Sequence, residues 1–142
     1  MKVALALLIC LSISLGRPLP GCGQASKSGG EAPLYELYSW SDPISHDWCF
    51  KLMYNTSRQK NAKEVLDGKD ELKGVNGLKK RIGELQPKTK IIWLGELTTS
   101  EGHKQKGSEK LGYPPEQVIQ DVKQFALERE IEIVGPFKSS DR

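Results

Sequence analysis

The polar run at residues 55–60 has the residue types best suited to binding chemistry. Arg58 and Lys60 carry positive charges that can pair with an anion. Three further side chains of the run offer hydrogen-bond donors: Asn55, Thr56 and Ser57. The same residues also suit a turn that leads into a helix capped by Asn61. The run therefore predicts either a site for a small anionic or polar ligand or a simple connection, and both interpretations stay open.

Glu96 lies near the end of an apolar run at residues 90–97, and His103 lies in the polar loop that follows this run. Ligand sites in open α/β sheets lie beyond the carboxyl ends of parallel strands. We therefore expect residues 55–60, Glu96 and His103 to gather at one edge of a sheet. The loop 98–112 contains no predicted element, and such a long loop is functional or disordered. A small enzyme at this edge would need Glu96 or His103 beside Arg58.

The histidines and Cys49 form no recognisable catalytic or metal-binding pattern. His46 and His103 each lack a second His or Cys at ligand spacing. Cys49 lies three residues after His46, and an odd spacing on a strand places two side chains on opposite faces. We therefore expect no catalytic residue, no metal and no cofactor.

The N-terminal segment predicts export. Lys2 precedes an apolar run from Val3 to Leu15, which has the length of a signal peptide. A helix of that length is too short to cross a hydrocarbon core of about 30 Å. We expect residues 1–21 to be removed, although the small residues before Arg17 offer an ordinary cleavage site as well.

Leu19-Pro20-Gly21-Cys22 resembles the lipobox of bacterial lipoproteins, which has Leu three residues before a cysteine and Gly directly before it. The resemblance implies that Cys22 is acylated and becomes the mature N-terminus. Residues 22–32, which are rich in Gly and Ser, would then form a flexible tether. The acyl chains would hold the protein at a membrane of the cell envelope.

The sequence before Cys22 departs from the lipobox pattern, because Arg17 and two prolines interrupt the apolar stretch. A secreted or periplasmic soluble protein therefore stays open, in which Cys22 and Cys49 could form a disulfide. If Cys22 is acylated instead, Cys49 is a lone thiol in an oxidising compartment and should be buried.

The charge of the chain gives no reason to expect a nucleic-acid partner. The chain has 21 basic and 18 acidic residues, for a formal net charge of +3. Loss of residues 1–21 removes Lys2 and Arg17 but no acid, so the mature protein is close to neutral. Nucleic-acid binding needs a clustered basic surface. Residues 33–142 have the length of a single small domain.

Hydrophobic patterns predict four strands that would position these residues. Residues 34–40 and 47–54 suggest a β-hairpin, residues 90–97 an inner strand, and residues 131–135 a last strand. The second strand alternates, with Trp48, Phe50, Leu52 and Tyr54 on one face and Cys49, Lys51 and Met53 on the other.

Three helices are expected between the strands. A short one has Asn61 as its N-cap and Glu64 three residues later. A long one runs from Asp70 toward Pro87 with one apolar stripe, and another long one begins at Pro114 or Pro115. The order ββαβαβ predicts an α/β fold bordering on α+β. We expect a four-stranded mixed sheet with both long helices on one face and one short extra helix.

The body of the chain resembles short bacterial proteins of unknown function in the segments "YSW", "DWCFKLM", "SRQK", "LKG", "IIWLG" and "PPEQVIQDV". This resemblance implies a bacterial source and brings no activity with it. The sequence thus predicts an envelope-anchored lipoprotein of non-catalytic type, whose domain binds a protein partner or a small polar or anionic ligand. The alternatives are a secreted soluble protein with a Cys22–Cys49 disulfide and a small enzyme at the strand ends.

Overall fold

A computed structural model describes residues 31–136, so the predicted signal peptide, Cys22 and most of the predicted tether lie outside the described residues. Its elements in chain order are β1 (Leu34–Ser41), β2 (Trp48–Tyr54), α1 (Ala62–Val65), β3 (Leu72–Lys73), α2 (Gly74–Gly83), β4 (Lys90–Leu94), a 3-10 helix (Ser108–Lys110), α3 (Glu116–Leu127) and β5 (Glu132–Val134). Within residues 31–136, none of these helices has both the length and the apolar character needed to cross a membrane.

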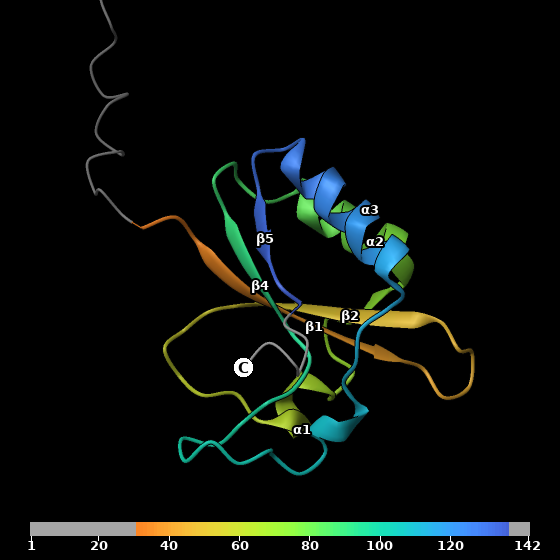
Figure 1. Ribbon diagram of the computed structural model, residues 1–142, viewed down its shortest axis with the longest axis vertical. Helices are drawn as coiled ribbons and strands as arrows, with labels where there is room; N and C mark the ends of the chain where they lie inside the picture. Colours follow the sequence, from red (N-terminus) through yellow and green to blue (C-terminus); the bar gives the residue numbers. More distant parts are fainter. Residues whose placement is uncertain (1–30, 137–142) are drawn as a thin grey trace, which may run out of the picture. The chain divides into compact units, whose positions relative to one another are not determined.

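The fold is a mixed α/β arrangement built on a five-stranded sheet with the order β3-β2-β1-β4-β5 (Figure 1). Strand β1 is central, pairing antiparallel with β2 and parallel with β4. The predicted hairpin is confirmed, and in its turn the Asp42 carboxylate accepts a hydrogen bond from the Ile44 N–H at 2.8 Å. The predicted inner strand is also confirmed, because β4 lies between β1 and β5.

The prediction of four strands is wrong by one. Leu72 and Lys73 were expected in the first turn of a helix opening at Asp70, but they form β3 and pair with Phe50 and Cys49 of β2. Asp70 has φ 54° and Gly74 has φ 70°. Both values lie in the left-handed region, which cannot occur inside a right-handed helix. Helix α2 therefore begins at Gly74, where glycine accepts this conformation without strain.

Helices α2 and α3 lie side by side on one face of the sheet, as the sequence predicts (Figure 1). Their buried side chains join those of the strands in one core: Leu37, Phe50, Leu78, Ile82, Ile91, Trp93, Ile119, Val122, Ala126 and Ile131. The buried Ser39 hydroxyl supplies hydrogen bonds to polar groups beside this core. It accepts one from Trp93 Nε1 at 2.8 Å and donates one to the Gly112 carbonyl at 2.5 Å.

The opposite face of the sheet is covered by α1 and by the loop that follows β4. A second apolar cluster lies under them, formed by Tyr38, Ala62, Val65, Leu97 and Leu111. The loop 98–112 is not structureless as expected, since it contains the 3-10 helix and an antiparallel bridge between Thr98 and Lys104. Its order has a physical cause: Leu97 and Leu111 bury themselves at its two ends.

Gly95 lies where the chain leaves β4, directly against the ring of Tyr113. A Cβ atom at this position would overlap the ring. We expect Gly95→Ala to lower the free energy of unfolding by about 1–3 kcal/mol, because the ring or the backbone must move. Urea unfolding of the full chain measures this loss.

Gly77→Ala is the matched control for Gly95→Ala. Gly77 lies in α2, and the nearest atom to an added Cβ would be 3.7 Å away, which is ordinary contact. This substitution should leave stability unchanged or raise it by up to about 1 kcal/mol, because alanine favours a helix over glycine. Equal effects of the two substitutions would contradict the close packing at Gly95.

Candidate functional site

The strand directions correct one expectation about the site. Strand β2 runs antiparallel to β1, while β1 runs parallel to β4, so Tyr54 at the end of β2 lies opposite Tyr35 near the start of β1. The expectation that residues 55–60, Glu96 and His103 meet because their strands are parallel is therefore wrong. The carboxyl ends of β2 and β4 lie at opposite ends of the sheet.

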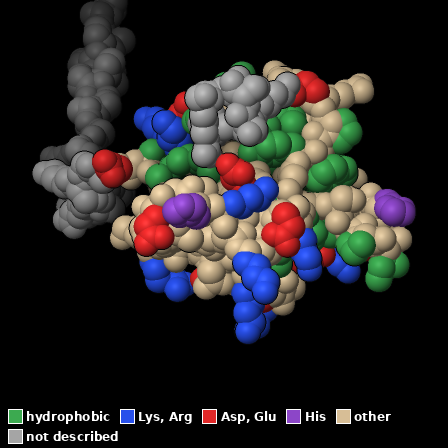
Figure 2. Space-filling model, turned by 60° about the horizontal axis from the view of Figure 1, so that its bottom comes forward, with side chains coloured by type: hydrophobic (Ala, Val, Ile, Leu, Met, Phe, Trp, Pro, Cys, Tyr) green, Lys and Arg blue, Asp and Glu red, His purple; other side chains and the backbone are tan. Residues whose placement is uncertain are grey.

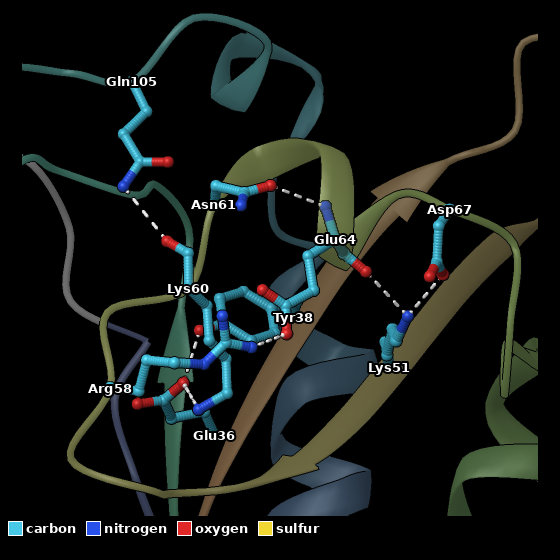
Figure 3. Close-up of polar contacts among 9 residues, drawn as sticks. All are labelled: Glu36, Tyr38, Lys51, Arg58, Lys60, Asn61, Glu64, Asp67 and Gln105. Carbon is cyan, nitrogen blue, oxygen red and sulfur yellow. Dashed lines mark hydrogen bonds and ion pairs between the residues drawn. The ribbon is translucent and has the colours of Figure 1, made fainter.

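Residues 55–61 instead form a strap that runs back across the sheet face opposite the long helices (Figure 3). The strap begins with the Asn55 N–H donating to the Leu34 carbonyl at 2.9 Å. It ends at α1, where Asn61 accepts a hydrogen bond from the Glu64 N–H at 2.9 Å, the cap that the sequence predicts. The strap thus carries its side chains over the middle of β1.

Lys60 fastens the strap to the sheet through a buried ion pair. Its Nζ lies 2.8 Å from Glu36 Oε2, and its side chain is only 4% exposed. The Tyr38 hydroxyl donates to the same Glu36 oxygen at 2.6 Å. Burial, together with the hydrogen bond to Glu36, raises the pKa of Tyr38 far above its ordinary value. Tyr38 therefore stays a neutral donor at physiological pH.

A second buried lysine lies next to α1. Lys51 Nζ, on β2, contacts Asp67 Oδ1 at 2.6 Å and donates to the Glu64 carbonyl at 2.9 Å. The hydrogen bond from Lys51 to Asp67, with help from the bond donated by the Lys69 N–H, lowers the pKa of the Asp67 carboxyl. The pair holds the end of α1 against the sheet, and Asp67 stays ionised.

Gln105 connects the strap to the loop 98–112. Its side-chain oxygen accepts a hydrogen bond from the Ala62 N–H at 3.2 Å, and its side-chain nitrogen donates to the carbonyls of Lys60 and Thr98, each at 3.1 Å. Gln59 also donates to the Thr98 carbonyl. The strap and the loop therefore do meet, although by folding back over the sheet and not at a shared strand edge.

An open pocket of about 420 Å³ lies between the strap, β2 and the segment after α1. We call it the charged pocket. Its lining residues are Lys51, Leu52, Met53, Tyr54, Thr56, Arg58, Lys60, Glu64, Asp67, Lys69 and Asp70. Arg58 pairs with Glu64 at its rim, where the guanidinium side chain is 67% exposed. On the face seen in Figure 2, acidic and basic side chains are mixed and no patch of one sign dominates.

The structure brings together only some of the residues proposed from the sequence. Thr56, Arg58 and Lys60 line the charged pocket, whereas Asn55 and Ser57 do not. Glu96 lies 3.9 Å from Lys104 Nζ, outside that pocket.

His103 is also outside the charged pocket. Its side chain is 80% exposed and lies 3.9 Å from Glu101. A neighbouring polar pocket between the strap and the loop is lined by Gln59, Lys60, Asn61, Thr99, Ser100, Glu101 and Gln105. It contains neither Glu96 nor His103, so these two residues do not converge with Arg58 in either pocket.

Sequence reasoning missed the acidic residues of the site. Glu36, Glu64, Asp67 and Asp70 were not proposed, and neither was Lys51. One signal was available, because Glu36 and Lys51 are the single charged residues of β1 and β2. A charged residue on such a strand is buried only when it has a partner, which would have directed attention to this face of the hairpin.

Comparisons with protein-family models, with curated proteins and with solved structures found no match for this chain.

The chemistry that the charged pocket can support follows from its own residues. The lining residues supply ammonium, guanidinium, hydroxyl and carboxylate groups, and neither cysteine nor histidine is among them. Among residues 31–136, no three His, Cys, Asp or Glu side chains are placed to hold a metal ion. The arrangement suits recognition by ion pairs and hydrogen bonds.

Cys49 lies on the same face of β2 as Lys51 but is only 3% exposed. Burial, together with a hydrogen bond to Glu71, raises its pKa from 9.0 to about 12. The folded state therefore favours the protonated thiol. This preference adds its full contribution to the free energy of unfolding below pH 9, and the contribution is lost as the pH rises from 9 to about 12.

Cys49 should react slowly with thiol reagents while the protein is folded. We expect iodoacetamide at pH 8 to modify it at least about a hundredfold more slowly than in concentrated urea, because the thiolate is scarce and the sulfur is covered. The mature chain with Cys22→Ser isolates this thiol, and intact mass against time gives the rate. Similar rates in buffer and urea would contradict the buried position of Cys49.

Proposed function

We propose that this protein is a non-catalytic binding protein, held at a membrane of the cell envelope by acyl chains on Cys22. In this proposal the folded domain recognises a small polar ligand, or a polar group of a protein partner, in the charged pocket. The single observation that carries the binding part is the pocket itself, in which two buried lysines and a rim arginine are held by carboxylates.

Fixed charges in an open pocket favour binding over a purely structural role. Lys51 and Lys60 lose solvation on burial, and a stable protein could place apolar side chains there at no loss of stability. Each ammonium group has three N–H donors. Among the described residues, Lys60 Nζ has one hydrogen-bond acceptor and Lys51 Nζ has two. Each ammonium group therefore keeps at least one N–H donor beyond these partners, on side chains that are 6% exposed for Lys51 and 4% exposed for Lys60.

Two observations weigh on the alternatives. A disulfide between Cys22 and Cys49 would need the tether to reach a sulfur that is almost fully covered. A small enzyme at the strand ends would need Glu96 or His103 beside Arg58, and these residues lie in separate places. The anchored binding protein is therefore the function we favour.

Hydrogen–deuterium exchange of the mature, acylated protein tests the binding part of this proposal. The protein in detergent is exposed either to a small-molecule extract or to the solubilised proteins of the envelope of its host. We expect slower exchange at residues 51–70 with one fraction, compared with detergent alone. Unchanged exchange at these residues with both fractions would contradict the proposal.

A further inference from the structure

Strand β2 has a free edge next to the charged pocket. On one side β2 pairs with β1 from Trp48 to Tyr54, but on the other side it pairs with β3 only at Cys49 and Phe50. Within residues 31–136, no strand pairs with that other side beyond Phe50. The last residues of β2 therefore have one partner strand where the inner strands of the sheet have two.

The shortness of β3 has a local cause. Two residues before Leu72, Asp70 has φ 54°, a left-handed conformation that an extended strand does not contain. The chain that arrives from α1 therefore joins the sheet only at Leu72. The stretch of β2 that a longer β3 would cover begins at Leu52.

Leu52 and Tyr54 direct their backbone groups toward the free edge. The Asn55 N–H donates to the Leu34 carbonyl at 2.9 Å, on the side of β1. Backbone directions alternate along a strand of an antiparallel pair, so the N–H and C=O groups of Tyr54 and Leu52 point away from β1. The pairing of Phe50 with β3 on this outer side fits the same alternation. The edge thus offers two donors and two acceptors to an added strand.

A pocket lies on each face of the sheet beside this edge. The charged pocket includes Lys51 and Met53, on the face covered by α1. A second pocket of about 430 Å³, which we call the acidic pocket, is lined by Leu52, Asp70, Glu71, Leu72, Arg81 and Glu84. Leu52 and Asp70 line both pockets, so the pockets adjoin at the free edge. Successive side chains of an added strand alternate between the two faces and therefore between the two pockets.

The acidic pocket has an excess of negative charge. Its lining has three carboxylates, those of Asp70, Glu71 and Glu84. Its one cation, Arg81, pairs with Glu84 at 3.0 Å. Two leucines of the sheet add apolar surface. The stem of a lysine or arginine packs on apolar surface while its charged end reaches carboxylates, so this pocket fits a basic side chain.

We propose that the free edge of β2 binds an extended segment of a partner polypeptide, which adds to the sheet as a strand and places a lysine or arginine side chain in the acidic pocket. Backbone hydrogen bonds with Leu52 and Tyr54 give affinity, and the two pockets select alternate side chains. This inference rests on the proposed binding function and specifies the partner.

Charge and composition favour a partner segment over the other possible occupants. A second copy of this chain, paired through the same edge, would bring its own acidic pocket beside this one, and like charges oppose that contact. Residues 22–30 of the predicted tether are rich in glycine, which is depleted in strands.

Peptide selection on the soluble mature chain with Cys22→Ser tests this inference. The probe is a phage-displayed library of random peptides, and each enriched sequence is synthesised and titrated into the 15N-labelled chain. We expect enriched sequences with a lysine or arginine, and slower amide exchange at Leu52 and Tyr54 in the complex. Methylation of a peptide nitrogen that faces β2 should weaken binding about tenfold, because one hydrogen bond is lost.

Two substitutions of Tyr54 isolate the backbone contact. Tyr54→Pro removes one outward N–H, and a strand accepts proline where its N–H faces away from the neighbouring strand. Tyr54→Ala removes the same ring but keeps the N–H. The enriched peptides should therefore bind Tyr54→Pro about tenfold more weakly than Tyr54→Ala.

Asp70→Asn tests the acidic pocket. Asparagine accepts the left-handed conformation of this position as aspartate does, so the turn is kept. Basic peptides should bind this variant about threefold more weakly, the loss of one exposed charge contact. Glu128→Gln is the matched control, because Glu128 is exposed at the end of α3 and lines neither pocket. This control should bind like the unmodified chain.

The possible results separate this inference from the binding function on which it rests. No enriched peptide, equal binding by Tyr54→Pro and Tyr54→Ala, or equal binding of basic peptides by Asp70→Asn and the unmodified chain would overturn it. Slow exchange of Leu52 and Tyr54 without peptide would also overturn it, in favour of the tether, or of a second copy if the protection rises with protein concentration. In each case, slower exchange at residues 51–70 with an envelope fraction would leave the binding function standing.

Discussion

Glu36→Ala should destabilise the folded domain by about 3 kcal/mol, the loss expected when one partner of a buried ion pair is removed. The substitution leaves the ammonium group of Lys60, which is 4% exposed, without its carboxylate. It also removes the acceptor of the Tyr38 hydroxyl. The strap can relieve the buried charge by lifting from the sheet. Urea unfolding followed by circular dichroism measures the loss.

Glu132→Ala is the matched control for Glu36→Ala. Glu132 pairs with Lys90 at 3.7 Å on the same sheet, but both side chains are largely exposed. Exposed pairs contribute little, so this substitution should change stability by less than about 0.5 kcal/mol. Pairing Glu36→Leu with Lys60→Met should recover the part of the loss that comes from the buried charge, although the Tyr38 hydroxyl still lacks its acceptor. Equal losses for Glu36→Ala and Glu132→Ala would show that the Lys60 pair is not a fastening point.

Cys22→Ser should move the protein from the membrane fraction to the soluble fraction almost completely. A serine has no thiol to carry the acyl chains, and Gly21-Cys22 is the part of the sequence that predicts them. Firm attachment needs more than one chain, which the lipoprotein modification supplies. Expression in a bacterium that processes lipoproteins, followed by ultracentrifugation and immunoblotting, measures the distribution.

Cys49→Ser provides the comparison for this experiment. Cys49 is also a mature cysteine, but it is buried in the folded domain and is not near the lipobox-like residues. Its variant should remain in the membrane fraction. Retention of Cys22→Ser at the membrane would contradict a lipid anchor, and release of Cys49→Ser would show that the folded domain itself holds the protein there.

Local patterns were enough to predict most elements of the fold. The alternation at residues 47–54 placed Phe50 and Lys51 on opposite faces of β2, as observed. The cap at Asn61 follows from side-chain chemistry within a few residues, and α3 begins at Glu116, one residue after the predicted start at Pro114 or Pro115. Strand β3 was missed because two residues carry no periodicity and its pairing with β2 depends on the backbone at Gly74.

Long-range pairing explains what the sequence could not predict about the site. Arg58, Lys60 and Thr56 were found from residue type alone, and they share the charged pocket. The sequence could not predict that Glu36 is the ion-pair partner of Lys60, because that contact depends on the strap crossing the sheet. Glu96 and His103 were placed near Arg58 by a parallel topology that β2 does not adopt. The chemistry of the side chains could therefore be predicted from the sequence, whereas the relative direction of the strands could not.

The intact mass of the protein recovered from the envelope of a bacterium that processes lipoproteins tests the proposed anchored binding protein most directly. Compartment, attachment and the state of Cys49 all depend on the mature N-terminus. We predict a chain that begins at Cys22 and carries added acyl mass, with Cys49 as a free thiol. A chain that begins at Arg17, without acyl mass and two hydrogens lighter through a Cys22–Cys49 disulfide, would contradict the proposal.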